Sequence, residues 1–87
     1  MTIKFTDEFY REFKRLPTKI QNLFRKQEIR FRKHQKDSRL HLKKLAGDSG
    51  TFSLRITSSY RALFYFEAES KAIFITIGHR KDVYRKK

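Results

Sequence analysis

The sequence predicts an α+β fold in which an N-terminal strand and a helical hairpin pack on one face of a small antiparallel sheet. Three observations support this prediction. Apolar residues recur at helical spacing between positions 7 and 34. Between positions 51 and 78 they instead alternate with polar residues, or run continuously as in a central strand. Turn residues divide that second region into three segments, which are expected to pair as sequential neighbours.

The first element expected is a short strand over residues 2–6, followed by a helix over about 7–16. Thr6 or Asp7 can cap this helix, because their side-chain oxygens can accept a hydrogen bond from the first turn. The helix then shows an apolar recurrence at Phe9, Phe13 and Leu16. The strand residues expected to face the helices are Ile3 and Phe5.

A second helix is expected over about 18–34. Pro17 ends the first helix or opens this one, since proline lacks the backbone donor that a helix interior needs. Cationic side chains lie largely off its apolar stripe, and the stripe is therefore expected to pack on the sheet. The stripe consists of Ile20, Leu23, Phe24, Gln27 and Phe31.

The remainder of the chain predicts a polar connection and three strands. Residues 35–50 are polar, with a turn at Asp48–Gly50, and strands are expected over about 51–57, 60–67 and 72–78. Strict alternation assigns one face of each outer strand to the helices. The residues expected on that face are Phe52, Leu54, Ile56, Ile73, Ile75 and Ile77, whereas Ser53, Arg55, Thr57, Phe74, Thr76 and Gly78 are expected to face away.

The net charge says most about function. The chain, expected to form a single domain over 1–87, carries 22 Lys and Arg against nine Asp and Glu, a net charge of +13. This charge predicts a polyanionic partner: nucleic acid, an anionic membrane surface or an acidic protein. No Cys is present, which excludes disulfides and thiolate metal sites. With no apolar run near the roughly 20 residues that span a bilayer and no signal-peptide pattern, a cytoplasmic protein is expected.

Three arginines can reach the sheet face that the helical hairpin leaves open. Arg55 alternates with the apolar residues of its strand, Arg61 begins the next strand, and Arg80 keeps the required parity if the chain stays extended. Arginines converging from three strands would make a phosphate-binding site. The structural alternative is that each is a surface charge lying over apolar neighbours.

The segment His79–Arg85 adds two candidates for proton transfer. Tyr84, flanked by cations, could take a proton from a ribose 2′-hydroxyl or stack on a base, and its structural alternative is to close the core. His79 is the alternative base, although its parity places it on the core side. The histidines are far apart and join no Asp/Glu cluster, and no glycine-rich phosphate loop exists, so neither a metal site nor a cofactor site is predicted.

Three segments resemble the RelE/ParE superfamily of toxins from type II toxin–antitoxin systems, and RelE-type mRNA interferases most closely. They are Leu42–Gly47, Phe52–Arg61 with its Leu-Arg-Ile … Tyr-Arg pattern, and Ile77–Tyr84 with its Gly-His-Arg … Val-Tyr ending. The order of one strand, two helices and three strands is also similar. The resemblance covers nearly the whole chain and implies a RelE-like fold.

The resemblance implies an endoribonuclease that cuts messenger RNA on the ribosome, inhibits translation and is silenced by an acidic antitoxin. It places Arg61 and Arg80 on the arginines that bind the reacting phosphate, and Tyr84 on the proposed general base. Arg55 matches a basic strand position, whereas Ser53 stands where the family has a neighbouring cation. The implied chemistry is metal-independent attack by the 2′-hydroxyl, with a 2′,3′-cyclic phosphate and a free 5′-hydroxyl as products.

The basic segment from Arg11 to Lys44 is expected to meet ribosomal RNA phosphates, since it contains thirteen cations and three anions. Two alternatives remain open: a ParE-like inhibitor of DNA gyrase, and an RNA-binding module without chemistry. Retention of Arg61, Arg80 and Tyr84 together favours the RelE-like ribonuclease. The expected RNA contacts are Arg25, Lys26, Arg30, Lys33, Lys43, Lys44 and Lys81.

Overall fold

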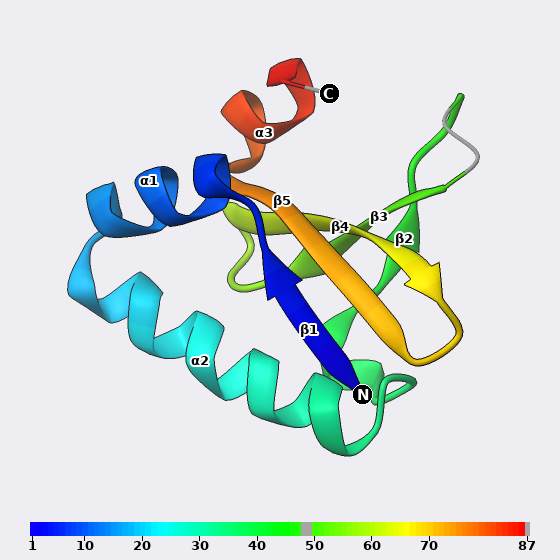
Figure 1. Ribbon diagram of the computed structural model, residues 1–87. Coiled ribbons are helices and arrows are strands. Elements are labelled where there is room, and N and C mark those ends of the chain that lie inside the picture. The colour runs from blue at the N-terminus through cyan, green and yellow to red at the C-terminus, as the bar shows by residue number, and fades with distance from the viewer. Residues whose placement is uncertain (48–49, 87) are drawn as a thin grey trace.

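The computed structural model describes residues 1–47 and 50–86, so most of the predicted turn at Asp48–Gly50 lies outside the described residues. The described strands form one sheet in the order β1-β5-β4-β3-β2 (Figure 1). The strands are β1 (Thr2–Phe5), β2 (Lys43–Lys44), β3 (Thr51–Arg55), β4 (Tyr60–Ala68) and β5 (Lys71–His79). The helices are α1 (Asp7–Arg15), α2 (Thr18–Lys33), a short 3-10 helix η1 (Ser38–Leu40) and α3 (Arg80–Lys86).

The predicted α+β class is confirmed, and the predicted helices and strands agree with the structure to within a few residues. Thr6 caps α1 as expected, accepting a hydrogen bond from the backbone N–H of Phe9 at 3.1 Å. The sheet is mixed, because β1 pairs with β5 in parallel while the other neighbours are antiparallel. The two-residue strand β2 was not predicted, since its lysines carry no apolar alternation.

An aromatic core holds α1 and α2 against one sheet face. Phe74 lies at its centre, with ring centroids 5.9 Å from Phe9, 5.7 Å from Phe24 and 5.9 Å from Phe31. The α2 stripe faces the core as predicted: Leu23 is half-buried and its other members are buried, including the polar residue Gln27. Burying several large rings compensates for the small volume of a chain of this length.

The position of Phe74 corrects the predicted faces of β5. Strict alternation assigned Ile73 and Ile75 to the helices and Phe74 to the opposite face, whereas Phe74 packs on the helices and the two isoleucines are half-buried. The cause is a β-bulge: Leu63 pairs with Thr76 but the next residue, Phe64, pairs with Phe74. An extra residue on one strand reverses the parity beyond it. The predicted faces of Thr76, Ile77 and Gly78 are therefore correct.

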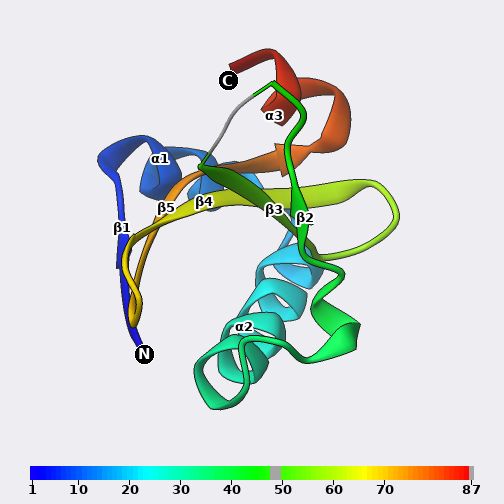
Figure 2. The same ribbon diagram turned by 90° about the vertical axis from the view of Figure 1, so that its right-hand side faces the viewer.

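The opposite face of the sheet is partly covered by α3, which was not predicted. The chain leaves the sheet after His79, so Arg80 begins a helix rather than extending the strand. Val83 is fully buried, yet it lies outside the main aromatic core, and α3 packs on β4 and β5. Figure 2 shows α2 and α3 on opposite sides of the sheet. Among the helices of the described residues, none combines the length and hydropathy needed to cross a bilayer.

Candidate functional site

A basic hollow of about 370 Å³ lies on the sheet face opposite α2, between α3 and the segment that enters β2. Its described lining contains cations, a tyrosine and a histidine but no Asp or Glu. We call it the basic hollow below. A concave surface with unneutralised positive charge is suited to an anion such as phosphate. The lining residues are His41, Leu42, Lys43, Ser53, Arg55, Arg61 and Tyr84.

Strand register brings two of the three predicted arginines together. Arg55 lies directly opposite Arg61 across β3 and β4, and Lys43 lies opposite Ser53 across β2 and β3. Like charges in directly opposed positions destabilise a sheet, so this arrangement costs stability until an anion neutralises it. The cation absent at Ser53 is thus partly replaced by Lys43 from the neighbouring strand.

The turn between β3 and β4 fixes the Arg61 side chain. One guanidinium nitrogen, Nη1, donates hydrogen bonds to the carbonyl oxygens of Thr57 and Tyr60, the second at 3.2 Å. The Thr57 hydroxyl in turn accepts from the backbone N–H groups of Ser59 and Tyr60, both at 3.1 Å. A guanidinium has five N–H donors, so Arg61 keeps donors available for a phosphate while its orientation is set.

The first turn of α3 places Tyr84 and Arg80 near each other. Tyr84 lines the basic hollow and is 42% exposed. Arg80 is exposed and does not line the hollow, but it lies four residues earlier, on the same side of the helix. The backbone N–H of Arg80 donates to the Ser59 carbonyl at 2.7 Å. This bond ties the start of α3 to the turn that holds Arg61.

His79 lies on the other side of the sheet from Arg61. Its neighbour Gly78 pairs with Arg61, and His79 pairs with Tyr60, so its side chain has the opposite parity. The His79 ring lies 5.6 Å from the Tyr60 ring, and its Nδ1 accepts a hydrogen bond from the Lys81 backbone at 3.2 Å. A β-carbon added at Gly78 would meet the Val83 side chain at 3.5 Å, so that glycine lies under α3 and not under an open ligand surface.

The expected RNA-contact residues divide into free and engaged side chains. Lys26, Lys33, Lys43, Lys44 and Lys81 are exposed. The Arg25 guanidinium lies 5.1 Å from the centroid of the Phe13 ring, a cation–π contact. Arg30 donates to the Gln27 amide oxygen at 2.8 Å. The lysines are therefore the sharper probes of the surface, because replacing either arginine would also disturb packing.

Sequence reasoning missed the roles of two residues at this site, and the first is Gln27, which was assigned only to the buried stripe of α2. Its amide nitrogen donates to the carbonyl oxygens of Arg39 at 2.9 Å and Arg55 at 2.7 Å. It thereby fastens α2 to the end of β3 and to η1, just before the segment that lines the hollow. A glutamine within an apolar stripe was the available signal, since a buried amide requires partners.

The second missed residue is His41, which lines the basic hollow and has a left-handed backbone with φ 46° and ψ 50°. A non-glycine residue with positive φ is uncommon and must be stabilised by its surroundings. No sequence signal marked it, because a lone histidine in a polar segment has no distinguishing pattern. Within the described residues, no group of three or more His, Asp or Glu side chains could hold a metal ion.

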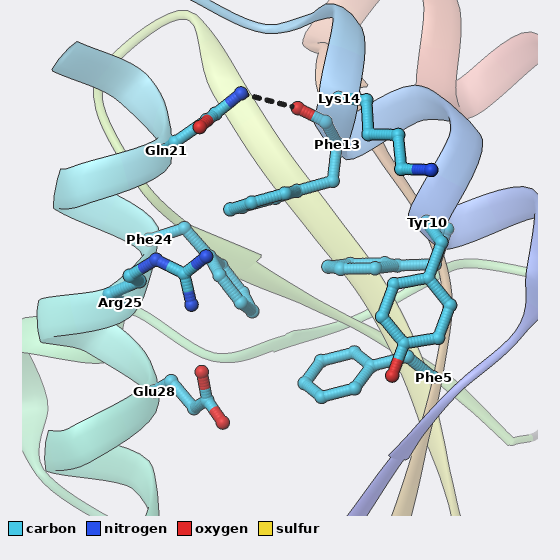
Figure 3. Close-up of a pocket in the computed structure, with 9 residues that line it drawn as sticks. Phe5, Tyr10, Phe13, Lys14, Gln21, Phe24, Arg25 and Glu28 are labelled. Atoms are coloured by element: carbon cyan, nitrogen blue, oxygen red, sulfur yellow. Dashed lines mark hydrogen bonds between the residues drawn. The ribbon is translucent and has the colours of Figure 1, made fainter. Parts of the chain in front are cut away.

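A second hollow, of about 460 Å³, opens between α1 and α2 and is lined mainly by aromatic rings. Figure 3 shows the rings of Phe5, Tyr10, Phe13 and Phe24 facing this space. Tyr10 is 52% exposed, which is unusual for a ring that borders an aromatic core. We call this second hollow the aromatic hollow. Its charged or polar lining residues are Lys14, Gln21, Arg25 and Glu28.

Solved structures with this arrangement of elements include toxins. The RelB–RelE antitoxin–toxin complex from Methanococcus jannaschii matches with a TM-score of 0.76 and 22% identity over 93% of this chain and 94% of that chain. The chain has the RelE-like toxin fold. YafQ from E. coli matches this RelE-like chain with a TM-score of 0.77 and 9% identity, over 94% of this chain and 96% of its own. No family model and no curated protein sequence matches it.

The YoeB/ParE toxin from Agrobacterium tumefaciens also has this fold, with a TM-score of 0.76 and 15% identity over 92% of this chain and 99% of that chain. The RelE-like fold expected from the sequence resemblance is therefore confirmed. Fold identity does not by itself assign an activity, because function resides in the site. Evidence about the activity must therefore come from the residues that line the basic hollow.

Proposed function

We propose that this RelE-like chain is the toxin of a type II toxin–antitoxin system and acts as a ribosome-dependent endoribonuclease on messenger RNA. One observation carries the proposal: Arg55, Arg61 and Tyr84 line the same hollow, whose described lining includes no acidic residue. Two arginines can bind one phosphate while a phenol oxygen faces the adjacent ribose. The likeness to solved RelE and YafQ structures supports the same assignment.

In the proposed reaction the ribose 2′-oxygen attacks the neighbouring phosphorus, and the bond from phosphorus to the 5′-oxygen breaks. The Tyr84 phenolate accepts the 2′ proton as the general base and becomes the neutral phenol. Arg61 stabilises the charge that develops on the equatorial oxygens, and Arg55 orients the phosphate. Arg80, one helical turn from Tyr84, adds a further cation once RNA occupies the hollow. The alternative base, His79, is the weaker candidate because it does not line the hollow.

The exposed lysines of α2, together with Lys44 of β2, would hold the chain on ribosomal RNA. Contacts of this kind are made to phosphates, are largely independent of sequence and weaken as salt rises. They would position the basic hollow over the message without reading its bases. This division assigns binding to the outer surface and chemistry to the hollow.

We further propose an acidic antitoxin as the partner that silences the toxin in the cytoplasm. The Methanococcus jannaschii relative was solved as an antitoxin–toxin complex, and an E. coli relative as the intact RelBE complex. The aromatic hollow offers this partner an apolar anchor, with Lys14 and Arg25 at its margin to pair with acidic side chains (Figure 3). The same margin carries one acidic residue, Glu28, so the complementarity is local.

Cleavage of ribosome-bound message by purified variants tests the function. Arg61→Ala should lower the rate about 100- to 1000-fold, as expected when one charge-stabilising donor is removed. Tyr84→Phe keeps the ring and deletes the hydroxyl, so it should lower the rate if Tyr84 is the base and leave it nearly unchanged if the ring only stacks or packs. If both variants cleaved the message at the parent rate, the active site would lie elsewhere on the chain. Inhibition of gyrase supercoiling without any RNA cleavage would support the ParE-like alternative instead.

A further inference from the structure

We propose that His41 is the general acid of this site, the residue that protonates the 5′-oxygen as it leaves phosphorus. The inference rests on the proposed ribonuclease function and adds a proton donor that the arginines and Tyr84 do not supply. Its basis is placement: among the described residues that line the basic hollow, His41 is the one imidazole.

The backbone that leads into His41 is held in place. Leu40, immediately before it, is fully buried, and the carbonyl of Arg39 accepts the hydrogen bond from Gln27. The Asp37 side chain caps η1 through the backbone N–H of Arg39 at 2.9 Å and also pairs with its guanidinium at 2.7 Å. That side-chain pairing holds the pKa of the Asp37 carboxyl well below its usual range, so the cap stays ionised near neutral pH.

At His41 the backbone is held in place while the side chain is free to contact a ligand. Its backbone N–H donates to the Ser38 carbonyl at 3.1 Å, and the left-handed conformation turns the chain from η1 toward β2. Among the described residues no hydrogen bond or ion pair engages the imidazole, which is exposed. A histidine held in an unfavourable backbone conformation with an unengaged ring is suited to act on a ligand.

The reaction needs a donor that the other lining cations cannot replace. Breaking the bond from phosphorus to the 5′-oxygen leaves an alkoxide unless a proton arrives as the bond breaks. Arginine does not lose its proton in proteins, and lysine is ordinarily a weak acid at neutral pH. Imidazole titrates nearest neutrality, at a pKa of about 6.5, where proton transfer is most effective.

With His41 as the acid, every proton in the proposed reaction has a donor and an acceptor. The 2′-hydroxyl proton passes to the Tyr84 phenolate, which becomes the neutral phenol, as the 2′-oxygen bonds to phosphorus. The 5′-oxygen takes a proton from the imidazolium of His41, which becomes the neutral imidazole. The products are a 2′,3′-cyclic phosphate and a free 5′-hydroxyl, after which solvent restores both side chains. The ionisable groups that line the basic hollow with His41 are Lys43, Arg55, Arg61 and Tyr84. His41 also borders a separate hollow of about 310 Å³, where the ionisable neighbours are Lys36 and Asp37.

The decisive test compares two messages on the ribosome in single-turnover cleavage. One carries the ordinary phosphodiester, and the other carries sulfur in place of the bridging 5′-oxygen at the cut site. A thiolate leaves without protonation, so it does not need a general acid. His41→Asn is the chosen variant because asparagine tolerates a left-handed backbone, and His41→Gly repeats the test with no side chain. His34→Asn, at the exposed end of α2, is the matched control.

His41→Asn should cut the ordinary message about 100- to 10,000-fold more slowly than the parent chain, the range typical of acid–base catalysis. It should cut the sulfur-containing message within a few-fold of the parent rate, and His34→Asn should match the parent on both. Equal losses on both messages, or no loss on either, would overturn the role of His41 while leaving the ribonuclease function standing. If the parent chain cuts neither message, that result refutes both the proposed ribonuclease function and the proposed role of His41.

Discussion

Replacing Gln27 with leucine should uncouple the basic hollow from the helical layer. The amide lies at 5% exposure and donates to two backbone carbonyl oxygens, those of Arg39 and Arg55, while accepting from Arg30. Leucine has a similar size but no hydrogen-bonding group, so packing is largely kept. The change therefore removes the polar link between α2, η1 and β3 with little effect on core volume.

The expected loss of stability follows from those two donated bonds. A hydrogen bond contributes a net free energy of about 0.5–1.5 kcal/mol, so Gln27→Leu should lower the free energy of unfolding by about 1–3 kcal/mol. For a domain of this size, each kcal/mol corresponds to roughly 4–8 °C in Tm. Because the backbone beside Arg55 and His41 loses its anchor, we also expect cleavage to fall by up to about 100-fold, the effect of a small misplacement of reacting groups.

Gln21→Leu provides the matched control. The Gln21 amide also donates to two backbone carbonyls, that of Phe13 at 3.0 Å (Figure 3) and that of Leu16 at 3.1 Å. These bonds lie at the junction of α1 and α2, and Gln21 does not line the basic hollow. Thermal melts and single-turnover cleavage should show a similar loss of stability in both variants and a loss of rate in Gln27→Leu alone. Equal cleavage by the two variants would refute the positioning role of Gln27.

Three further outcomes are expected. Replacing Lys26 and Lys33 with glutamine should flatten the salt dependence of ribosome binding, by about 0.7–0.9 in logarithmic slope for each phosphate that is no longer neutralised, and an unchanged slope would remove α2 from the interface. A saturating acidic antitoxin should raise the Tm, since a ligand at 100 times its Kd adds about 2.7 kcal/mol of stability; an unchanged midpoint would count against that partner. Phe24→Ala, in the aromatic core, should cost about 3–5 kcal/mol in chemical denaturation, and a decrease below about 1 kcal/mol would contradict the packing described.

Local periodicity was sufficient to predict the described helices and strands, apart from η1, β2 and α3. The α2 stripe follows a helical period along the helix, and Phe52 and Leu54 follow a period of two, so each pattern specified both element and face. The β5 faces were wrong for a reason that no single-strand pattern contains. The bulge near Ile75 depends on its neighbours: Thr6 donates its backbone N–H to Phe74 and its hydroxyl to Ile75, both at 3.0 Å.

The candidate site, like the fold, could be predicted from the sequence only in part. Arg55 and Arg61 were predicted from strand parity and Tyr84 from its cationic neighbours, all three with support from the resemblance, and the structure places them at one hollow. Arg80 was expected to extend the strand, but the chain turns into α3, whose packing through Val83 is a tertiary effect. His41 enters the hollow through a left-handed turn held by Gln27 and Asp37, partners that are not adjacent to it in sequence. Such contacts become visible once the chain is folded.

The most direct test of the central claim is cleavage of a ribosome-bound message that carries a single 2′-deoxyribose at the cut site. The account predicts that the parent chain cuts the all-ribose message, leaving a 2′,3′-cyclic phosphate and a 5′-hydroxyl, and leaves the substituted position intact because the nucleophile is missing. Cleavage at the deoxyribose position at an undiminished rate, or failure to cut the all-ribose message on ribosomes, would contradict it.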